Sequence, residues 1–211
     1  MVSWDGIGLE EFLSETPSMR LTGMNDEELV LEGTYEINAI VDGWNHIHDS
    51  FALKMVVNRR YPRVIPKVYE TEGKIPPKSE HHINPDGSFC LGSELRVKDI
   101  ASKFPGLDQF AQRLLIPFLY SVSHKIRYNS YPYGDLDHGN DGLYDDYQKM
   151  FNVDSKPAVK AVMKALGRRK REANKLPCPC GCDRRLGRCD YRYFLGRFRK
   201  LERRRWFRSH L

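Results

Sequence analysis

The sequence lacks any run of about 18 apolar residues, although apolar residues make up 40% of its 211 positions. A chain without such a run is not expected to cross a membrane as a helix. Its first residues also lack a basic segment followed by an apolar one, so they do not resemble a secretory signal peptide. We therefore expect a cytoplasmic protein with no membrane association and a packed core.

Cysteine is scarce, and its distribution is uneven. The chain has five cysteines; Cys90 is the only one in the first 177 residues, and the other four lie between positions 178 and 189. An odd number of cysteines, distributed in this way, does not suit a closed set of disulfides. A solitary thiol and a compact group of thiols suit a reducing compartment instead, which agrees with a cytoplasmic location.

The net charge of +6 hides a division of the chain. Residues 156–211 contain 19 Lys and Arg against 4 Asp and Glu, whereas residues 1–155 contain 15 against 24. The first part is therefore acidic and the last part strongly basic. We expect one domain over residues 1–154 and a basic tail over residues 155–211.

Alternating apolar and polar residues predict β-strands in the first third of the chain. The pattern runs over residues 29–41 and 50–57, with an Asp-Gly turn signal at 42–43 between them, and a short third strand is expected at 66–70. Short connections between successive strands favour an antiparallel β-meander.

Apolar residues spaced by three and four positions predict helices in the rest of the chain. Residues 107–122 show this pattern, and Pro117 should kink or divide the helix there. Further helices are expected at residues 9–13, 143–151, 157–175 and 192–210. Strands followed by helices predict the α+β fold class.

Cys90 directly follows a predicted turn. Residues 85–87, Pro-Asp-Gly, favour a turn because proline presets φ, aspartate bonds its own backbone and glycine accepts a positive φ. His81 and His82 precede this turn. A thiol presented in this way can act as a nucleophile if the thiolate forms at the moment of attack. The alternative is a small buried cysteine with two surface histidines nearby.

The stretch around Cys90 resembles the ubiquitin-conjugating enzymes. That family has, in order, the motifs Tyr-Pro-x-x-Pro-Pro-x-Val, His-Pro-Asn and Gly-x-(Ile/Val)-Cys-Leu. This chain has their counterparts in the same order: Tyr-Pro at 61–62 with Pro-Lys-Val at 66–68, the His-rich turn, and Gly-Ser-Phe-Cys-Leu at 87–91. The resemblance spans about residues 28–150. It implies a ubiquitin-conjugating-enzyme-like fold. It also implies a transferase that carries an activated protein C-terminus as a thioester on Cys90 and passes it to an amine.

The resemblance also assigns roles to neighbouring residues. The family's asparagine supports the oxyanion of the intermediate, and counting back from Cys90 places that position at His82 rather than Asn84. An imidazole can donate a hydrogen bond to an oxyanion, and unlike an amide it can titrate near neutrality. Asn84 is the second candidate if the turn has a different shape.

Residues 133–141 fall where conjugating enzymes keep a gate beside the cysteine. By this resemblance, Asp137 and His138, with Asp135 behind them, are candidates to orient an incoming lysine amine and help to deprotonate it. The alternative is a solvated acidic loop.

Four thiols between positions 178 and 189 predict a metal site. Cys178, Cys180, Cys182 and Cys189 can supply a tetrahedral thiolate set, and two glycines allow the backbone to wrap an ion. Residues 178–190 are similar to the SEC-C motif, Cys-Pro-Cys-Gly-x-Gly-x-x-x-x-x-Cys-(His/Cys). We expect a structural zinc ion in a small helical zinc-knuckle domain. Asp190 is the substitute ligand if Cys182 does not turn inward.

The basic tail also carries aromatic residues, a combination that binds nucleic acid through phosphate neutralisation and stacking. An acidic protein partner is an equally open interpretation. So is a helical hairpin whose aromatic residues pack and whose arginines are solvated.

No G-x-G-x-x-G fingerprint occurs, so adenylation of the carried protein requires a separate activating enzyme. The histidine at position 82 and the unusual tail favour a prokaryotic member of the family. Bacterial relatives of this kind occur in antiphage defence operons of the CBASS type, where the modified protein is a cyclic-oligonucleotide synthase. The competing interpretations are a cysteine hydrolase and a non-catalytic scaffold that tethers an acidic protein or nucleic acid.

Overall fold

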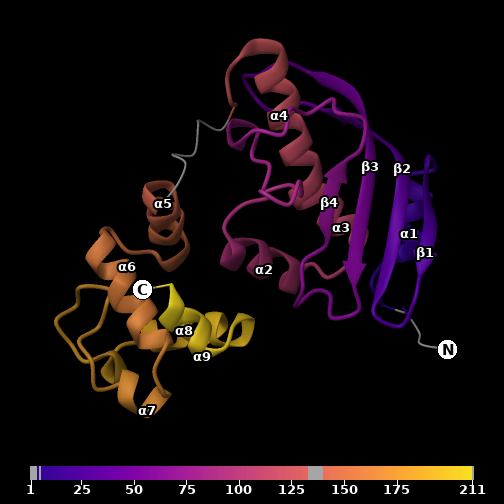
Figure 1. The fold of residues 1–211 in the computed structure, drawn as a ribbon. Helices are drawn as coiled ribbons and strands as arrows, with labels where there is room; N and C mark the ends of the chain where they lie inside the picture. The colour runs from indigo at the N-terminus through magenta and orange to yellow at the C-terminus, as the bar shows by residue number, and fades with distance from the viewer. Residues whose placement is uncertain (1–3, 5, 133–139, 211) are drawn as a thin grey trace. The chain divides into compact units, whose positions relative to one another are not determined.

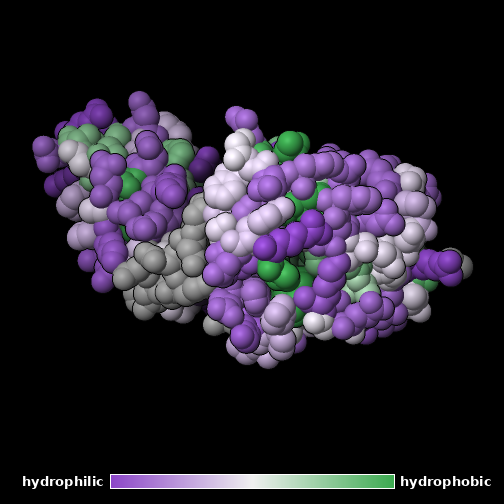
Figure 2. Space-filling view, turned by 90° about the horizontal axis from the view of Figure 1, so that it is seen from above, coloured by the Kyte–Doolittle hydropathy of each residue, from purple (hydrophilic) through white to green (hydrophobic). Residues whose placement is uncertain are grey.

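The structure is a computed structural model that describes residues 4, 6–132 and 140–210; the side chains of Ser79, Asn140 and Asp141 also lie outside the description. The chain divides into two compact units, residues 1–135 and residues 136–211, which we call the N-terminal and C-terminal units. No helix among the described residues is both long enough and apolar enough to cross a bilayer. The surface seen in Figure 2 is mainly hydrophilic, with small apolar patches.

The N-terminal unit contains an antiparallel sheet of four strands in chain order (Figure 1). These strands are β1 (Met19–Met24), β2 (Glu28–Ala39), β3 (Ile47–Asn58) and β4 (Lys67–Glu70). The predicted strands at 29–41, 50–57 and 66–70 correspond to β2, β3 and β4, so the meander is confirmed. β1 was not predicted, because Met19 is its only buried residue and the alternation is therefore weak.

One face of the sheet forms the core of this unit. Alternate residues of β2 and β3 are buried, as the two-residue period of a strand requires. Tyr35 and Phe51 stand opposite each other in the β2–β3 register and are both almost completely buried. This arrangement, together with the helices below, gives the α+β class that the sequence predicts.

Helices cover this face of the sheet. α1 (Leu9–Glu15) packs on α3 (Leu107–Phe110), and α4 (Ile116–Tyr128) packs on β2 and β3. A π-helical turn (Ala111–Leu115) separates α3 from α4, and Pro117 lies in the first turn of α4. The backbone stays in the right-handed helical region through this turn, and Pro117, which has no N–H to donate, lies just after the change in hydrogen-bond pattern. The division into abutting helices expected at this proline is therefore confirmed.

Asp49 ties the sheet to α4. Its carboxylate pairs with Lys74 and with Arg127 (2.8 Å) and accepts a hydrogen bond from Ser123 (3.0 Å). Burial alone would raise the pKa of Asp49, but its bonds with Lys74, the Ser50 N–H and Ser123 lower the pKa below its ordinary value.

The C-terminal unit is helical. It contains α5 (Asn140–Phe151), α6 (Lys156–Leu166), α7 (Lys170–Ala173), the 3-10 turn Leu186–Arg188, α8 (Tyr191–Leu201) and α9 (Arg204–Ser209) (Figure 1). The helix predicted at 143–151 is confirmed. The single helices predicted at 157–175 and 192–210 are wrong, because each is divided in two.

Both breaks have a local cause. Gly167 ends α6 where the backbone lies close to α9; a Cβ on this residue would lie 2.8 Å from Cγ of Arg208. Extended backbone at Glu202 and Arg203 separates α8 from α9. The change of direction allows α8 and α9 both to pack on α6.

Apolar residues from four helices form the core of this unit. Phe151, Leu166, Phe198 and Phe207 are completely buried, and the ring of Phe151 meets that of Phe198 edge to face at 5.0 Å. The hydroxyl of Tyr191 donates to the carbonyl of Phe151. These contacts make α5 part of the C-terminal unit, whereas the boundary expected at 154 assigned it to the preceding domain.

Candidate functional site

The chain reaches Cys90 through a turn held by its own hydrogen bonds. Ser88 and Asn84 pair through their backbones (2.8 Å), and Gly87 has a φ of 82°. The Asp86 carboxylate accepts from the N–H (3.1 Å) and hydroxyl (2.6 Å) of Ser88 and pairs with Lys67 (2.7 Å). The bond from Lys67 is the main reason that the pKa of Asp86 lies well below its usual range. The turn expected at 85–87 is therefore present.

Phe89 anchors the end of this turn to the core. Its N–H donates to the carbonyl of Val68 in β4 (2.8 Å), and its ring stacks on Phe118 of α4 with centroids 4.5 Å apart. Only 6% of Phe89 is exposed, whereas Cys90 is partly exposed. Cys90 is thus a partly exposed residue held in place by a buried neighbour.

His82 lies beside Cys90. The N–H of Cys90 donates to the carbonyl of His82 (2.7 Å), and His82 has a φ of 54°, in the left-handed region that histidine and asparagine tolerate better than most residues. The imidazole of His82 meets the ring of Tyr131 at 5.4 Å, and the hydroxyl of Tyr131 donates to the carbonyl of Glu80. Tyr131 therefore connects the segment after α4 with the loop that carries His82.

Asn84 acts within the turn. Its side-chain amide donates to the hydroxyl of Ser88 (3.1 Å) and to the carbonyl of Phe89 (3.2 Å). These bonds use both amide hydrogens to hold the segment that leads to Cys90. Asn84 is thus a positioning residue for the thiol.

His81 is buried, a property that the sequence did not predict. It is 8% exposed, and its Nδ1 has no hydrogen-bond partner among the described residues. Burial, reinforced by Lys78 and Lys125, lowers the pKa of His81 against the opposing effect of Glu80. A buried imidazole therefore directly precedes His82 in the chain. Nothing in the local sequence distinguishes this buried histidine from its neighbour.

The remaining candidates for the thiol site, Asp137 and His138, lie outside the described residues, as does Asp135.

The four C-terminal cysteines come together in one group. Their sulfur atoms all lie within 4.8 Å of one another, with 3.2 Å between Cys178 and Cys180 and 3.7 Å between Cys180 and Cys189. A tetrahedral ion with metal–sulfur bonds of about 2.3 Å separates its thiolates by about 3.8 Å. Cys178, Cys180, Cys182 and Cys189 can therefore hold a metal ion. Cys182 belongs to this group, so the set needs no ligand from Asp190.

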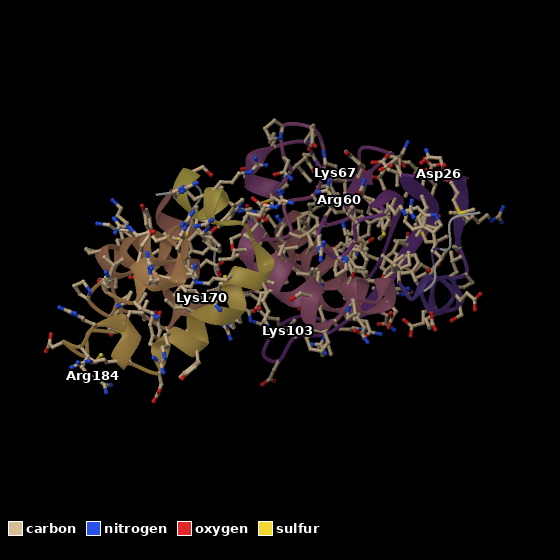
Figure 3. The ribbon with its side chains drawn as sticks, turned by 90° about the horizontal axis from the view of Figure 1, so that it is seen from below. Asp26, Arg60, Lys67, Lys103, Lys170 and Arg184 are labelled. Carbon is tan, nitrogen blue, oxygen red and sulfur yellow. The ribbon has the colours of Figure 1, made fainter. Side chains whose placement is uncertain are left out.

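Backbone geometry around the group explains how so short a segment converges. The N–H of Cys178 donates to the carbonyl of Arg184 (2.8 Å), and Gly181 and Asp183 have φ values of 77° and 56°. The backbone N–H and then the side chain of Arg184 lower the pKa of Cys182 to about 6, which favours the thiolate that a metal requires. Arg184 itself projects from the surface of the C-terminal unit (Figure 3).

Comparison with known proteins gave no match to any family model, curated protein or solved structure.

Proposed function

We propose that the chain is a ubiquitin-conjugating-like acyltransferase with Cys90 as its nucleophile. The thiolate of Cys90 attacks the thioester that links a protein C-terminus to an activating enzyme. A new carbon–sulfur bond forms on Cys90, and the activating enzyme's thiolate leaves and takes up a proton. An amine of the acceptor then attacks the same carbonyl, an amide forms, and Cys90 is released.

The partial exposure of Cys90 is the observation that carries this proposal. A lone cysteine is usually a small buried hydrophobic residue, but here Phe89 is buried and Cys90 itself is partly exposed. The helix, four-stranded meander, cysteine and following helices also occur in the order that the family resemblance implies.

Transfer to a defined acyl donor tests the nucleophile without knowledge of the natural modifier. The full-length protein is incubated with a synthetic peptide α-thioester, and its intact mass is measured with and without reductant. We expect one adduct that a thiol reductant removes. The Cys90→Ser variant should form, more slowly, an oxyester that survives reductant, and Cys90→Ala should form no adduct. Equal labelling of Cys90→Ala and the unchanged protein would reject the proposal.

His82 is proposed to donate a hydrogen bond to the oxyanion of each tetrahedral intermediate. Loss of one such donor costs on the order of 10²-fold in rate. Three variants separate this role from the left-handed backbone: His82→Asn keeps a donor and tolerates the conformation, His82→Gly keeps only the conformation, and His82→Ala keeps neither. A His82→Gly variant as active as His82→Asn would show that the side chain does not act as a donor. Asp137 and His138 remain the proposed residues for receiving the amine.

The conjugated protein is proposed to be a cyclic-oligonucleotide synthase in a bacterial antiphage system of the CBASS type, with adenylation on a separate activating enzyme. The family resemblance alone supports this placement. Co-expression with a neighbouring synthase and activating enzyme should give a covalent conjugate of the synthase, and Cys90→Ala should abolish that conjugate. If Cys90→Ala binds the synthase but no modification occurs even with unchanged Cys90, the chain is a scaffold of the same fold.

The metal held by the four cysteines is proposed to be a structural zinc ion. Four thiolates satisfy tetrahedral zinc and leave no open position for chemistry. Elemental analysis of the purified protein should find about one zinc per chain, with Cys178→Ser at less than half of that and Cys90→Ser unchanged. Iron in place of zinc, or equal zinc content in Cys178→Ser, would contradict the assignment.

A further inference from the structure

Basic side chains cover the surface of the C-terminal unit. Of the 19 Lys and Arg residues between positions 156 and 208, all except Arg199 are exposed. The apolar core of the unit is made mainly by phenylalanine, leucine, valine and methionine side chains, and of these bases Arg197 lies over two of its rings, those of Phe194 and Phe198. A unit of this size carrying so many outward bases has a strong positive field, which attracts polyanions.

Arg199 is the exception because its guanidinium is turned toward backbone carbonyls near the end of α6. Its guanidinium donates to the carbonyls of Ala165 (2.7 Å) and Leu166 (3.1 Å) in the last turn of α6 and to that of Arg168 (2.8 Å) just after the helix. This cation therefore satisfies the negative end of the helix dipole. The other bases near the end of α6 are left to face solvent.

These neighbouring bases form a group that we call the α6-end cluster: Arg168, Arg169 and Arg204. Arg168 and Arg169 directly follow α6, and Arg204 begins α9, which packs on α6. All three are exposed. Arg204 is close enough to Arg199 to add to the effect of burial in lowering the pKa of that residue. The fold thus holds the guanidinium of Arg204 close to that of Arg199 although like charges repel.

The geometry and composition of this surface point to the phosphate backbone of nucleic acid, and we infer that the C-terminal unit binds it. Thirteen of the 19 bases are arginine, whose planar fork forms two hydrogen bonds with a phosphate. The bases occur on every helix of the unit from α6 to α9 rather than on one narrow face. A polymer with a regular array of charges can follow such a surface and neutralise many of these bases together.

An exposed aromatic side chain favours nucleic acid over an acidic protein. Tyr193 on α8 is 66% exposed, and the guanidinium of Arg192 lies 4.5 Å from its ring centroid. A tyrosine displayed beside an arginine can stack on a nucleobase while the arginine contacts a phosphate. A partner recognised only through carboxylates would not use this ring.

Binding of labelled oligonucleotides to the full-length protein tests the inference. Fluorescence anisotropy is measured with a mixed-sequence single strand and a duplex of about 20 nucleotides, a length that spans one or two such binding sites, over a salt series. We expect Kd to rise steeply with salt in both cases. The Arg168→Gln/Arg169→Gln/Arg204→Gln variant should bind on the order of tenfold more weakly, with a log–log salt slope reduced by about 2 to 3 for the duplex.

A matched control removes the same charge from the N-terminal unit. Arg59, Arg60 and Arg63 are exposed on the connection between β3 and β4, and Arg60 is visible on that surface in Figure 3. The Arg59→Gln/Arg60→Gln/Arg63→Gln variant should keep its affinity. Because the inference does not depend on the proposed acyl transfer, Cys90→Ser should also bind normally.

Competition with poly-L-glutamate of the same charge distinguishes the two classes of partner. We expect the oligonucleotide to bind more tightly than the polypeptide, and Tyr193→Ala to weaken single-strand binding. Equal or tighter binding of poly-L-glutamate would overturn the inference in favour of an acidic protein partner. Equal losses of oligonucleotide affinity in the two triple variants would also overturn it.

Discussion

Arg199→Ala should destabilise the C-terminal unit more than any substitution of its fully exposed bases. The change removes three charge-assisted hydrogen bonds, two to carbonyls in the last turn of α6 and one to the carbonyl of Arg168. Bonds of this kind contribute about 1.5–3 kcal/mol each when isolated. Arg199 is half-buried, so water will reach some of the freed carbonyls, and one guanidinium shares its charge among three acceptors. We therefore expect a total loss of about 3 kcal/mol in the free energy of unfolding.

Trp206 provides a local probe of this effect. It is one of three tryptophans and the only one in the C-terminal unit, where it lies on α9. In a Trp4→Phe/Trp44→Phe background, urea unfolding followed by tryptophan fluorescence therefore reports on that unit. Far-ultraviolet circular dichroism measures the N-terminal unit and the remaining helices in the same samples.

Two further substitutions separate the hydrogen bonds from the charge. Arg199→Lys keeps the positive charge but cannot reach three acceptors, so it should recover about 1 kcal/mol of the loss. Lys200→Ala removes a neighbouring exposed base and should change the stability by less than about 0.5 kcal/mol. If Arg199→Ala and Lys200→Ala have equal effects, or if Arg199→Lys is fully stable, the carbonyl contacts do not hold the end of α6.

Three other perturbations have expected outcomes. Cys189→Ser, like chelation of the metal, should lower the thermal midpoint of the C-terminal unit by at least about 10 °C because a bound metal contributes to folding; Cys90→Ser is the control, and an equal midpoint in both would contradict this role. Gly33→Ala should lower the free energy of unfolding by at least about 2 kcal/mol, because a Cβ at this φ of 148° would lie 2.0 Å from a backbone carbonyl oxygen. Gly43→Ala, with open space around it, should lower it by only about 1 kcal/mol. Equal losses in the two variants would refute the clash. The carboxylate of Asp49 stabilises the fold above its unfolded pKa of about 3.8, and this contribution is lost as the pH falls through the lower pKa of the folded state. Asp49→Asn should therefore make the free energy of unfolding depend less on pH at the acid end. An unchanged pH profile would refute the stabilising role of this carboxylate.

The sheet could be predicted where burial alternates along a strand. β2 and β3 each bury residues at alternate positions, and this left a clear pattern in the sequence. β1 lies at the edge of the sheet and has only Met19 buried, so its pairing with β2 comes from backbone hydrogen bonds that no side-chain pattern records. The central strands were therefore predictable from alternation, whereas β1 was not.

In the C-terminal unit the helical segments could be predicted, but their ends and their partners could not. Its apolar spacing predicted helical segments, but the ends of the helices depend on contacts between distant residues, such as Gly167 with Arg208. The sequence boundary at 154 followed the change in charge, whereas packing of Phe151 on Phe198 groups α5 with the basic segment. Charge describes the surface, so it could not reveal which core α5 would join.

The features of the candidate sites that depend on nearby residues could be predicted, and those that depend on tertiary packing could not. The turn before Cys90 and the convergence of four cysteines depend on residues close in sequence, and both could be inferred from spacing. The burial of His81 depends on how its loop packs in the folded unit. The use of the Asn84 amide within the turn depends on the final position of Ser88 and Phe89. Neither property has a signal in the local sequence.

The two proposed uses of cysteine constrain each other. An acyl carrier needs one reactive thiol, yet Cys180 is exposed and Cys182 partly exposed, so both are accessible to the same donor. A bound metal ion would hold these thiolates as ligands and lower their nucleophilicity, which leaves Cys90 as the free thiol. In the peptide thioester assay, chelated protein should therefore carry more than one reducible adduct, and the metal-bound protein only one. A single adduct under both conditions would mean that the metal site has no part in the selectivity for Cys90.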